Sequence, residues 1–117
     1  MSDILPFKTD AENESAEPLF IELTDDAADE IFNALSSNTS REILTYLHKD
    51  PAPPSELAEA TEITLQTTRY HLEKLESANL IEPIDTWYSS RGKEMTVYAP
   101  TNDPLVIMTG SENRKNF

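Results

Sequence analysis

The sequence predicts one mainly helical α+β domain, and three observations lead to this prediction. Its 117 residues are enough for one compact domain and too few for two. Four segments between residues 24 and 78 carry apolar residues at helical spacing, and each follows a residue suited to capping a helix. The segments on either side of Gly92 are rich in β-branched and aromatic residues, which predicts a hairpin of two strands.

Composition places this domain among ordinary globular proteins. Hydrophobic residues make up 38% of the chain and charged residues 26%, and cysteine is absent, which excludes disulfides and thiolate metal sites. No run of 18 apolar residues occurs, and the acidic start carries no basic leader of the secretory type. These features predict an intracellular, cytoplasmic protein with no membrane partner.

The formal net charge of −13 is distributed unevenly. Residues 1–63 contain 15 acidic residues and 3 Lys or Arg, whereas residues 64–99 contain 5 acidic residues and 4 Lys or Arg. An acidic protein usually avoids polyanions or is adapted to high salt. Because the second half is almost neutral, a surface for nucleic acid remains compatible with this sequence, especially where salt screens charge.

The first third of the chain predicts a tail, a strand and a helix. Residues 1–17 are acidic and aperiodic, so they predict a disordered tail, or alternatively an acidic arm that competes with nucleic acid. Residues 18–23, "PLFIEL", predict a short strand or a strip on the core. Thr24 is a suitable N-cap for the first helix. The residues expected on the inward face of that helix are Ile31, Phe32 and Leu35.

The middle of the chain predicts three more helices. Ser37 suits the cap of the second, and Asp50 with the prolines that follow it stops that helix. Ser55 suits the cap of a short third helix, and Thr64 the cap of a fourth that runs to about Ala78. Asn79 fits a left-handed position beyond the end of the fourth helix. The inward residues are Ile43, Leu44 and Leu47 in the second helix, Leu57 and Ala58 in the third, and Thr68, Leu72 and Leu75 in the fourth.

The last third predicts a hairpin followed by one more element. "LIEPIDTWYSS" and "MTVYAP" resemble strands joined by the turn "RGKE", where Gly92 supplies a permissive backbone. For "PLVIMTG" we favour a short helix, because Asp103 and Pro104 form a good cap and first-turn pair, and a strand is the alternative. The whole order predicts a winged helix-turn-helix domain over residues 18–103, with residues 104–117 as a C-terminal segment suited to a dimerisation helix.

In such a fold the helix predicted over residues 64–78 enters the major groove of double-stranded DNA by its N-terminal end. Gln66 can pair with adenine and Arg69 with guanine, whereas Thr67 and Tyr70 suit phosphate or methyl contacts. The wing, residues 86–99, carries two cations that suit the DNA backbone or the minor groove. The predicted DNA-binding residues are Thr64, Gln66, Thr67, Arg69, Tyr70, His71, Tyr88, Arg91 and Lys93.

Other interpretations of these residues remain open. The polar helix face can be merely solvated, and the charged turn can protect a strand edge. His71 suits a packing imidazole as well as a phosphate contact, and Tyr88 suits strand packing as well as base stacking. A protein-interaction module that keeps the fold without binding DNA is the alternative function, favoured by the net charge. No catalytic set, metal-ligand cluster or glycine-rich phosphate loop is visible, so we expect no enzyme, no metal and no cofactor.

Three stretches, "ALSSNTSREILTYL", "SELAEATEITLQTTRYHLEKLESANLIEP" and "WYSSRGKEMTVYAPTNDPLV", resemble the ArsR-like winged-helix regulators, particularly those of halophilic archaea. The resemblance covers about residues 28–107. It implies a sequence-specific transcription regulator, usually a homodimer joined through its terminal helices. It also implies DNA-contact roles for Thr64, Gln66, Thr67, Arg69 and Tyr70. This chain has Asn79 where a glycine is usual, and it lacks the cysteines of the metal-sensing members, so metal-responsive control is not expected.

A dimer also follows from the DNA, because two recognition helices must reach half-sites about 34 Å apart. A small domain would leave part of its apolar surface bare in the first helix and near the C-terminus. The residues predicted to pair across the dimer axis are Ile31, Phe32, Leu35, Leu105, Val106 and Met108.

Overall fold

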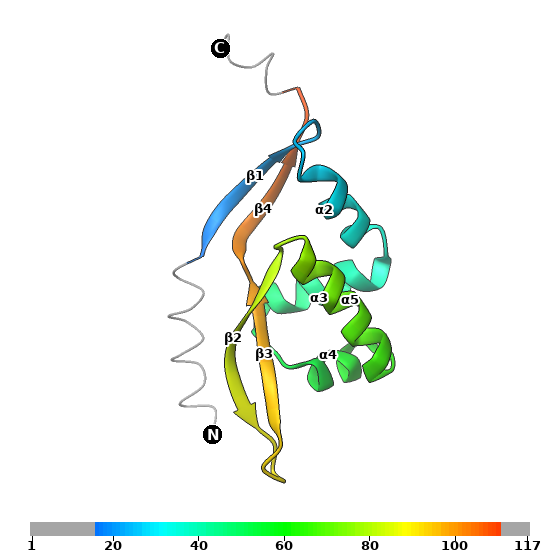
Figure 1. The fold of residues 1–117 in the computed structure, drawn as a ribbon, viewed down its shortest axis with the longest axis vertical. Coiled ribbons are helices and arrows are strands. Elements are labelled where there is room, and N and C mark those ends of the chain that lie inside the picture. The colour runs from blue at the N-terminus through cyan, green and yellow to red at the C-terminus, as the bar shows by residue number, and fades with distance from the viewer. Residues whose placement is uncertain (1–15, 111–117) are drawn as a thin grey trace.

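A computed structural model describes residues 16–110 of the chain (Figure 1). Along the chain it contains one strand, four helices and three further strands. The predicted mixture of helices with a two-stranded hairpin wing is therefore confirmed. Most of the segment predicted as an acidic tail, and residues 111–117 of the C-terminal segment, lie outside the described residues.

The four helices are α2 (Ala28–Leu35), α3 (Asn38–Lys49), α4 (Pro54–Thr61) and α5 (Leu65–Ser77). Their apolar faces meet in one core, and the predicted inward residues of α3, α4 and α5 are all buried. Ser37 caps α3 as predicted, because its hydroxyl accepts from the Thr39 and Ser40 amides at 3.1 and 3.3 Å. Within residues 16–110, no helix has the length and apolarity that crossing a bilayer requires.

Three predictions about the helices were wrong. Thr24 does not cap α2, which begins at Ala28 after a turn in which the Asp25 carboxylate accepts from the Glu22 amide at 2.9 Å. Ser55 does not cap α4, because Pro53 is the N-cap and Pro54, with its fixed φ, already occupies the first turn. Phe32 is 38% exposed instead of facing inward, whereas Ile31 beside it is buried.

The wing is the antiparallel pair β2 (Ile81–Tyr88) and β3 (Glu94–Pro100). Asn79, with φ of 62°, ends α5 in the left-handed conformation that was predicted, so that the chain turns directly into β2. The base of the wing is fixed to the helices, because Ala52 and Tyr98 exchange two backbone hydrogen bonds of 3.0 and 3.1 Å. The proline-rich link after α3 is therefore joined to β3 by a single antiparallel bridge.

The segment after the wing is a strand, β4 (Asn102–Met108), and not the favoured helix or dimerisation helix. It pairs in parallel with the first strand, β1 (Glu17–Glu22), which confirms the strand predicted in "PLFIEL". The β-branched pair Val106 and Ile107 suits a strand, and β1 supplies the hydrogen-bonding partner. The strand alternative for this segment was therefore correct.

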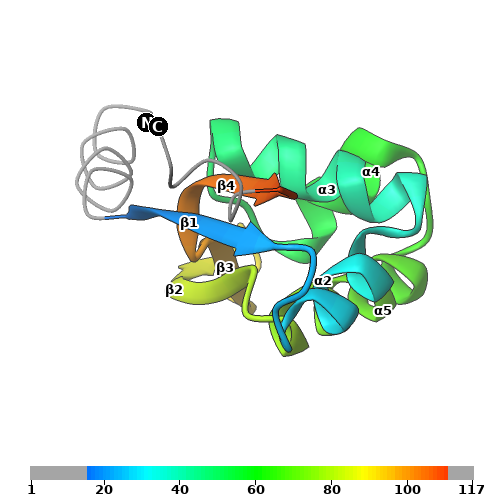
Figure 2. The ribbon, with the colours of Figure 1, turned by 90° about the horizontal axis from the view of Figure 1, so that it is seen from above.

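The two small sheets follow one another along one side of the molecule, and the four helices lie on the other side (Figures 1 and 2). β3 leads almost directly into β4, so a single line of chain runs from the tip of the wing to the opposite end (Figure 1). The core lies between this line and the helices, where Leu19 and Leu105 pack against the buried cluster. This arrangement leaves the wing tip and the start of α5 at the surface.

Candidate nucleic-acid interface

The helix-turn-helix consists of α4, a turn over residues 62–64, and α5. Glu62 adopts φ of 61°, and the Ile63 amide donates to the Ala58 carbonyl at 3.1 Å, which closes the end of α4. Thr64 then caps α5 as predicted, because its hydroxyl oxygen accepts from the Thr67 amide at 3.0 Å. The turn therefore fixes where α5 begins and which of its backbone amides remain free.

The first two turns of α5 present a polar surface. Gln66, Thr67, Arg69 and Tyr70 are all exposed, whereas Thr68 is fully buried and donates its hydroxyl to the Thr64 carbonyl at 2.9 Å. Leu72 and Leu75 are buried on the inward face of α5. The four polar residues lie on the opposite face of the helix and are therefore exposed. The first turn carries no acidic residue. An anion can therefore approach the free amides at this end of the helix.

Arg69 and Lys93 line one hollow of about 200 Å³ between the start of α5 and the wing. Arg69 also lies close to the base of the wing. Burial, followed by the charge of Glu76, raises the pKa of the Tyr98 hydroxyl above its ordinary value of 10.0, and Arg69 opposes this increase. The other residues that line the hollow are Pro54, Ser55, Leu65, Glu94, Met95, Thr96 and Tyr98. The helix and the wing thus form one continuous surface.

Tyr70 is held in place by Lys74, a neighbour whose role was not predicted from the sequence. The Lys74 ammonium lies 5.3 Å from the centre of the Tyr70 ring and 3.4 Å from its hydroxyl. Their separation of four residues, which puts both on one helix face, was a signal available in the sequence. Tyr70 remains 55% exposed, so its hydroxyl is accessible to a ligand.

His71 does not belong to the exposed surface, so its place among the DNA-binding residues was wrong. Its side chain is buried, and Nδ1 lies 2.8 Å from the hydroxyl of Ser40, a buried residue of α3. Burial, followed by the charge of Lys74, lowers the pKa of His71 below its ordinary value of 6.5. The packing role that the sequence also allowed is the correct one, and it joins α5 to α3.

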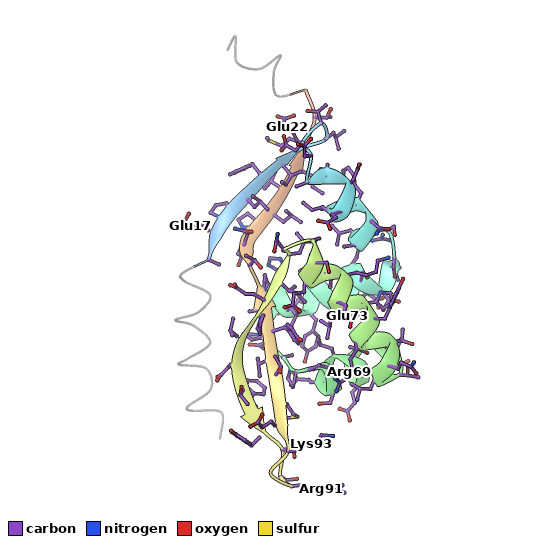
Figure 3. The ribbon with its side chains drawn as sticks, viewed as in Figure 1. Glu17, Glu22, Arg69, Glu73, Arg91 and Lys93 are labelled. Atoms are coloured by element: carbon purple, nitrogen blue, oxygen red, sulfur yellow. The ribbon has the colours of Figure 1, made fainter. Side chains whose placement is uncertain are left out.

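The wing tip is organised around Ser89. The Ser89 amide donates to the Lys93 carbonyl at 2.9 Å, and the Ser89 hydroxyl accepts from the Arg91 and Lys93 amides at 3.3 and 3.1 Å. Gly92 takes φ of 82°, the positive value that the predicted turn requires. Arg91 and Lys93 are exposed at this end of the molecule, and Arg69 lies on the adjoining part of α5 (Figure 3). Tyr88, at the end of β2, is 64% exposed.

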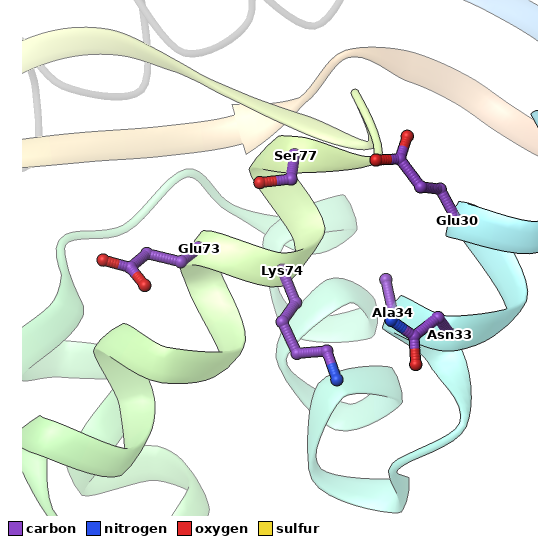
Figure 4. Close-up of a pocket in the computed structure, with 6 residues that line it drawn as sticks. All are labelled: Glu30, Asn33, Ala34, Glu73, Lys74 and Ser77. Carbon is purple, nitrogen blue, oxygen red and sulfur yellow. The ribbon is translucent and has the colours of Figure 1, made fainter.

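A second hollow, of about 260 Å³, lies between α2 and α5 (Figure 4). Lys74 extends toward Asn33 and Ala34 of α2, while Glu73 lies on the other side of α5 (Figure 4). Glu30 and Ser77 complete the lining. The lining carries two carboxylates and one ammonium, an excess of negative charge that disfavours phosphate, so this hollow marks the border of the surface suited to nucleic acid.

The predicted dimer residues are only partly at the surface. Ile31 is 2% exposed and lies in the core of its own chain, so it is unavailable to a partner. Leu35 and Leu105 are half-buried and pack against that core, whereas Phe32, Val106 and Met108 retain exposed surface. Within residues 16–110, no three histidine, aspartate or glutamate side chains gather in a way that could hold a metal ion.

Comparison with known proteins gives one family model and several solved structures. A model described as "Helix-turn-helix domain" matches residues 35–84. An ArsR family transcriptional regulator is 30% identical, with 63% of this chain and 70% of that chain covered and a TM-score of 0.51. An ArsR-like transcriptional regulator from Rhodococcus sp. is 27% identical, with 76% and 71% covered and a TM-score of 0.53.

A third structure resembles this chain in its fold. The homodimeric winged helix-turn-helix DNA-binding domain of a possible ArsR-family regulator from Mycobacterium bovis is 22% identical. The alignment covers 67% of each chain with a TM-score of 0.56. No curated protein matches the chain significantly.

Proposed function

Because this chain belongs to the ArsR-like winged helix-turn-helix proteins, we propose that it is a sequence-specific transcription regulator that binds double-stranded DNA as a homodimer. In this proposal α5 enters the major groove by its N-terminal end, and the wing of β2 and β3, which was predicted over residues 86–99, lies along the backbone or in the minor groove.

The hollow shared by Arg69 and Lys93 carries this proposal. It brings a cation of the recognition helix and a cation of the wing to one surface, beside the free amides at the start of α5. A DNA duplex presents phosphates on both sides of its major groove, so a helix in that groove and a wing beside it need cations on the same face. In a chain of net charge −13, a surface that carries two neighbouring cations is uncommon.

Each exposed residue has a chemical role in the proposal. Gln66 and Arg69 have the donors and acceptors that read adenine and guanine. Thr64, Thr67 and Tyr70 offer hydroxyl groups to phosphate oxygens, and Tyr70 can also contact a thymine methyl group. The cations of the wing and the exposed ring of Tyr88 hold the adjacent backbone. These roles belong to the list Thr64, Gln66, Thr67, Arg69, Tyr70, Tyr88, Arg91 and Lys93.

We also propose that the protein works at high salt, as the resemblance to regulators of halophilic archaea implies. The acidic end of the chain would repel DNA in dilute buffer. At 1 M salt the Debye length falls to about 3 Å, so only charges in contact with the phosphates still act on them. Binding under such conditions rests on the direct contacts of α5 and the wing.

The net charge of −13 favours a second candidate, a protein-interaction module that has kept the fold and lost DNA binding. A protein-interaction module of this kind does not require cations at both the recognition helix and the wing tip, so their presence favours DNA binding.

The deciding experiment is selection of duplexes from a random-sequence library in molar potassium chloride, with the Arg91→Ala/Lys93→Ala variant alongside. Enrichment of a two-fold symmetric motif by the parent, and weaker recovery by the variant, supports DNA binding. If nothing is enriched in either molar or dilute salt, DNA binding is overturned in favour of the interaction module.

A further inference from the structure

Leu65, the first residue of α5, is an apolar side chain on a surface that is otherwise polar. It is 40% exposed, and within residues 64–71 it is the one aliphatic side chain among the exposed residues. Ile63, two residues earlier, packs against the buried core, whereas Leu65 belongs neither to the core nor to the residues packed against it. The stability of the core therefore does not explain a leucine at this position.

Leu65 lines the hollow that Arg69 and Lys93 share. Arg69 follows Leu65 by four residues, which places the two side chains on one face of the helix, about 5–6 Å apart. Met95 of β3 lines the same hollow, and its sulfur accepts a hydrogen bond of 3.7 Å from the Ser55 hydroxyl, which orients the thioether. The hollow therefore combines an apolar part, formed by Leu65 and Met95, with a cationic part.

The chemistry of the major groove determines what an apolar side chain can recognise there. The base edges present hydrogen-bond donors and acceptors, and the apolar group among them is the C5 methyl of thymine. A leucine side chain neither donates nor accepts a hydrogen bond, so a polar base edge or a phosphate oxygen offers it no partner. A methyl group does, because the contact removes apolar surface of both groups from water.

We infer that Leu65 contacts a thymine methyl group and thereby determines one base pair of each half-site. The inference rests on the proposed function, because it requires α5 in the major groove of DNA. Base pairs are about 3.4 Å apart along the duplex, so a spacing of about 5–6 Å between Leu65 and Arg69 places this thymine one or two base pairs from the base that Arg69 reads. Leu65 was not among the predicted DNA-binding residues, all of which carry a polar group.

An apolar contact is well suited to a protein that binds DNA in concentrated salt. Salt weakens the contacts between cations and phosphates, because it screens their charges and reduces the gain from releasing counterions. The contact between Leu65 and a methyl group involves no charge, so salt does not screen it. The preference for thymine over the same base without its methyl should therefore stay constant from dilute to molar potassium chloride, while the total affinity falls.

Replacement of thymine by deoxyuridine tests the inference, because it removes the methyl group and preserves the base pair with its hydrogen-bonding groups. Each thymine of the selected site is replaced in turn, and the change in affinity is measured for the parent and for Leu65→Ala. At one position of each half-site the parent should lose affinity about fourfold, which corresponds to the roughly 0.8 kcal/mol of one buried CH₂ group. Leu65→Ala should show no loss at that position.

Three controls show whether the effect belongs to this side chain. Leu65→Met keeps a large apolar side chain and should retain most of the methyl dependence. Tyr70→Ala removes an exposed ring from the same helix and should leave the dependence at this position unchanged. Leu65→Ala should also unfold at nearly the temperature of the parent, because Leu65 lies outside the core.

The outcomes separate this inference from the proposed function. A parent that enriches a DNA motif and is insensitive to every replacement of thymine would refute the role of Leu65 and leave DNA binding intact. The same conclusion follows if Leu65→Ala loses as much affinity as the parent at every replaced thymine. A parent that enriches no duplex would refute the proposed function, and the inference would fall with it.

Discussion

At the scale of single residues, Arg69 is the side chain on which base reading should depend most. It is exposed near the start of α5 and lines the hollow next to the wing. Arg69→Ala should weaken binding to the selected site by about 1–3 kcal/mol and relax the preference at one base pair. Competition binding against single-base variants of the site measures both effects. Lys49→Ala, which removes a cation at the end of α3, should leave the base preference unchanged.

The buried histidine of α5 should make stability depend on pH. Because the pKa of His71 is lowered in the folded protein, the unfolded chain takes up a proton first as the pH falls. The free energy of unfolding should therefore decrease as the pH falls below about 6.5, and stop decreasing below the folded pKa of His71. Urea unfolding of the parent and His71→Gln at several pH values measures this, and the variant should lose the dependence. His48→Gln, which removes the other histidine, should retain it.

Helix caps and backbone conformations were predictable where the interacting residues are close in sequence. The Ser37 and Thr64 caps and the positive φ of Asn79 and Gly92 follow from neighbouring residues alone. The burial of His71 could not be predicted in this way, because its hydrogen-bonding partner Ser40 lies 31 residues away on another helix. The exposure of Phe32 likewise depends on which side of α2 the other elements cover.

At the scale of elements, the wing should contribute affinity without contributing sequence preference. Arg91→Ala/Lys93→Ala should weaken binding to every duplex alike. It should also flatten the slope of the logarithm of the binding constant against the logarithm of the salt concentration by up to about 2, one for each lost phosphate contact. Arg41→Ala/Lys49→Ala removes the same charge from α3 and serves as the control. Titrations of one duplex at four potassium chloride concentrations give the slopes. An unchanged slope in the wing variant would mean that neither cation meets a phosphate.

The caps of α3 and α5 separate stability from DNA contact. Ser37→Ala removes a hydroxyl that accepts from two backbone amides, and Thr64→Ala removes one that accepts from a single amide, so each should lower the free energy of unfolding by about 1 kcal/mol. Only Thr64→Ala should also reduce DNA affinity, since Thr64 is at the proposed interface. Thermal unfolding and DNA titration on the same samples test this. Equal DNA affinity of both variants would remove Thr64 from the interface.

The order of elements was predictable up to the wing, and the last element was not. Asp103 and Pro104 resemble a helix start, and only pairing with β1, a strand more than 80 residues earlier, makes β4 a strand. Strand formation depends more on a neighbouring strand than helix formation depends on a neighbouring helix. The local sequence pattern therefore could not decide between a helix and a strand for this segment. The difference bears on the predicted dimer residues, because Leu105, Val106 and Met108 lie on a strand and not on the expected helix.

At the scale of the whole molecule, a two-fold dimer predicts the layout of its DNA site. Half-sites should be centred about one helical turn apart, roughly 34 Å, because both α5 helices must enter the same side of the duplex. Insertion of about half a turn of DNA between the half-sites should abolish the gain from the second one, and a full turn should restore part of it. Gel-shift titrations of the three duplexes test this. Affinities that do not change with spacing would indicate independent monomers.

The parallel pairing of β1 with β4 has a consequence for how the protein is made. The helices from α2 to α5 can pack on one another as they leave the ribosome, since their contacts with one another all lie within residues 28–77. β1 is synthesised before these helices, yet its hydrogen-bonding partner β4 follows all of them, and the loop that must close spans 85 residues between Glu17 and Asn102. Until β4 has been synthesised, the apolar side chains of β1, Phe20 and Ile21 among them, therefore lack the strand with which β1 pairs. β1 can therefore complete its pairing only after the four helices have been synthesised.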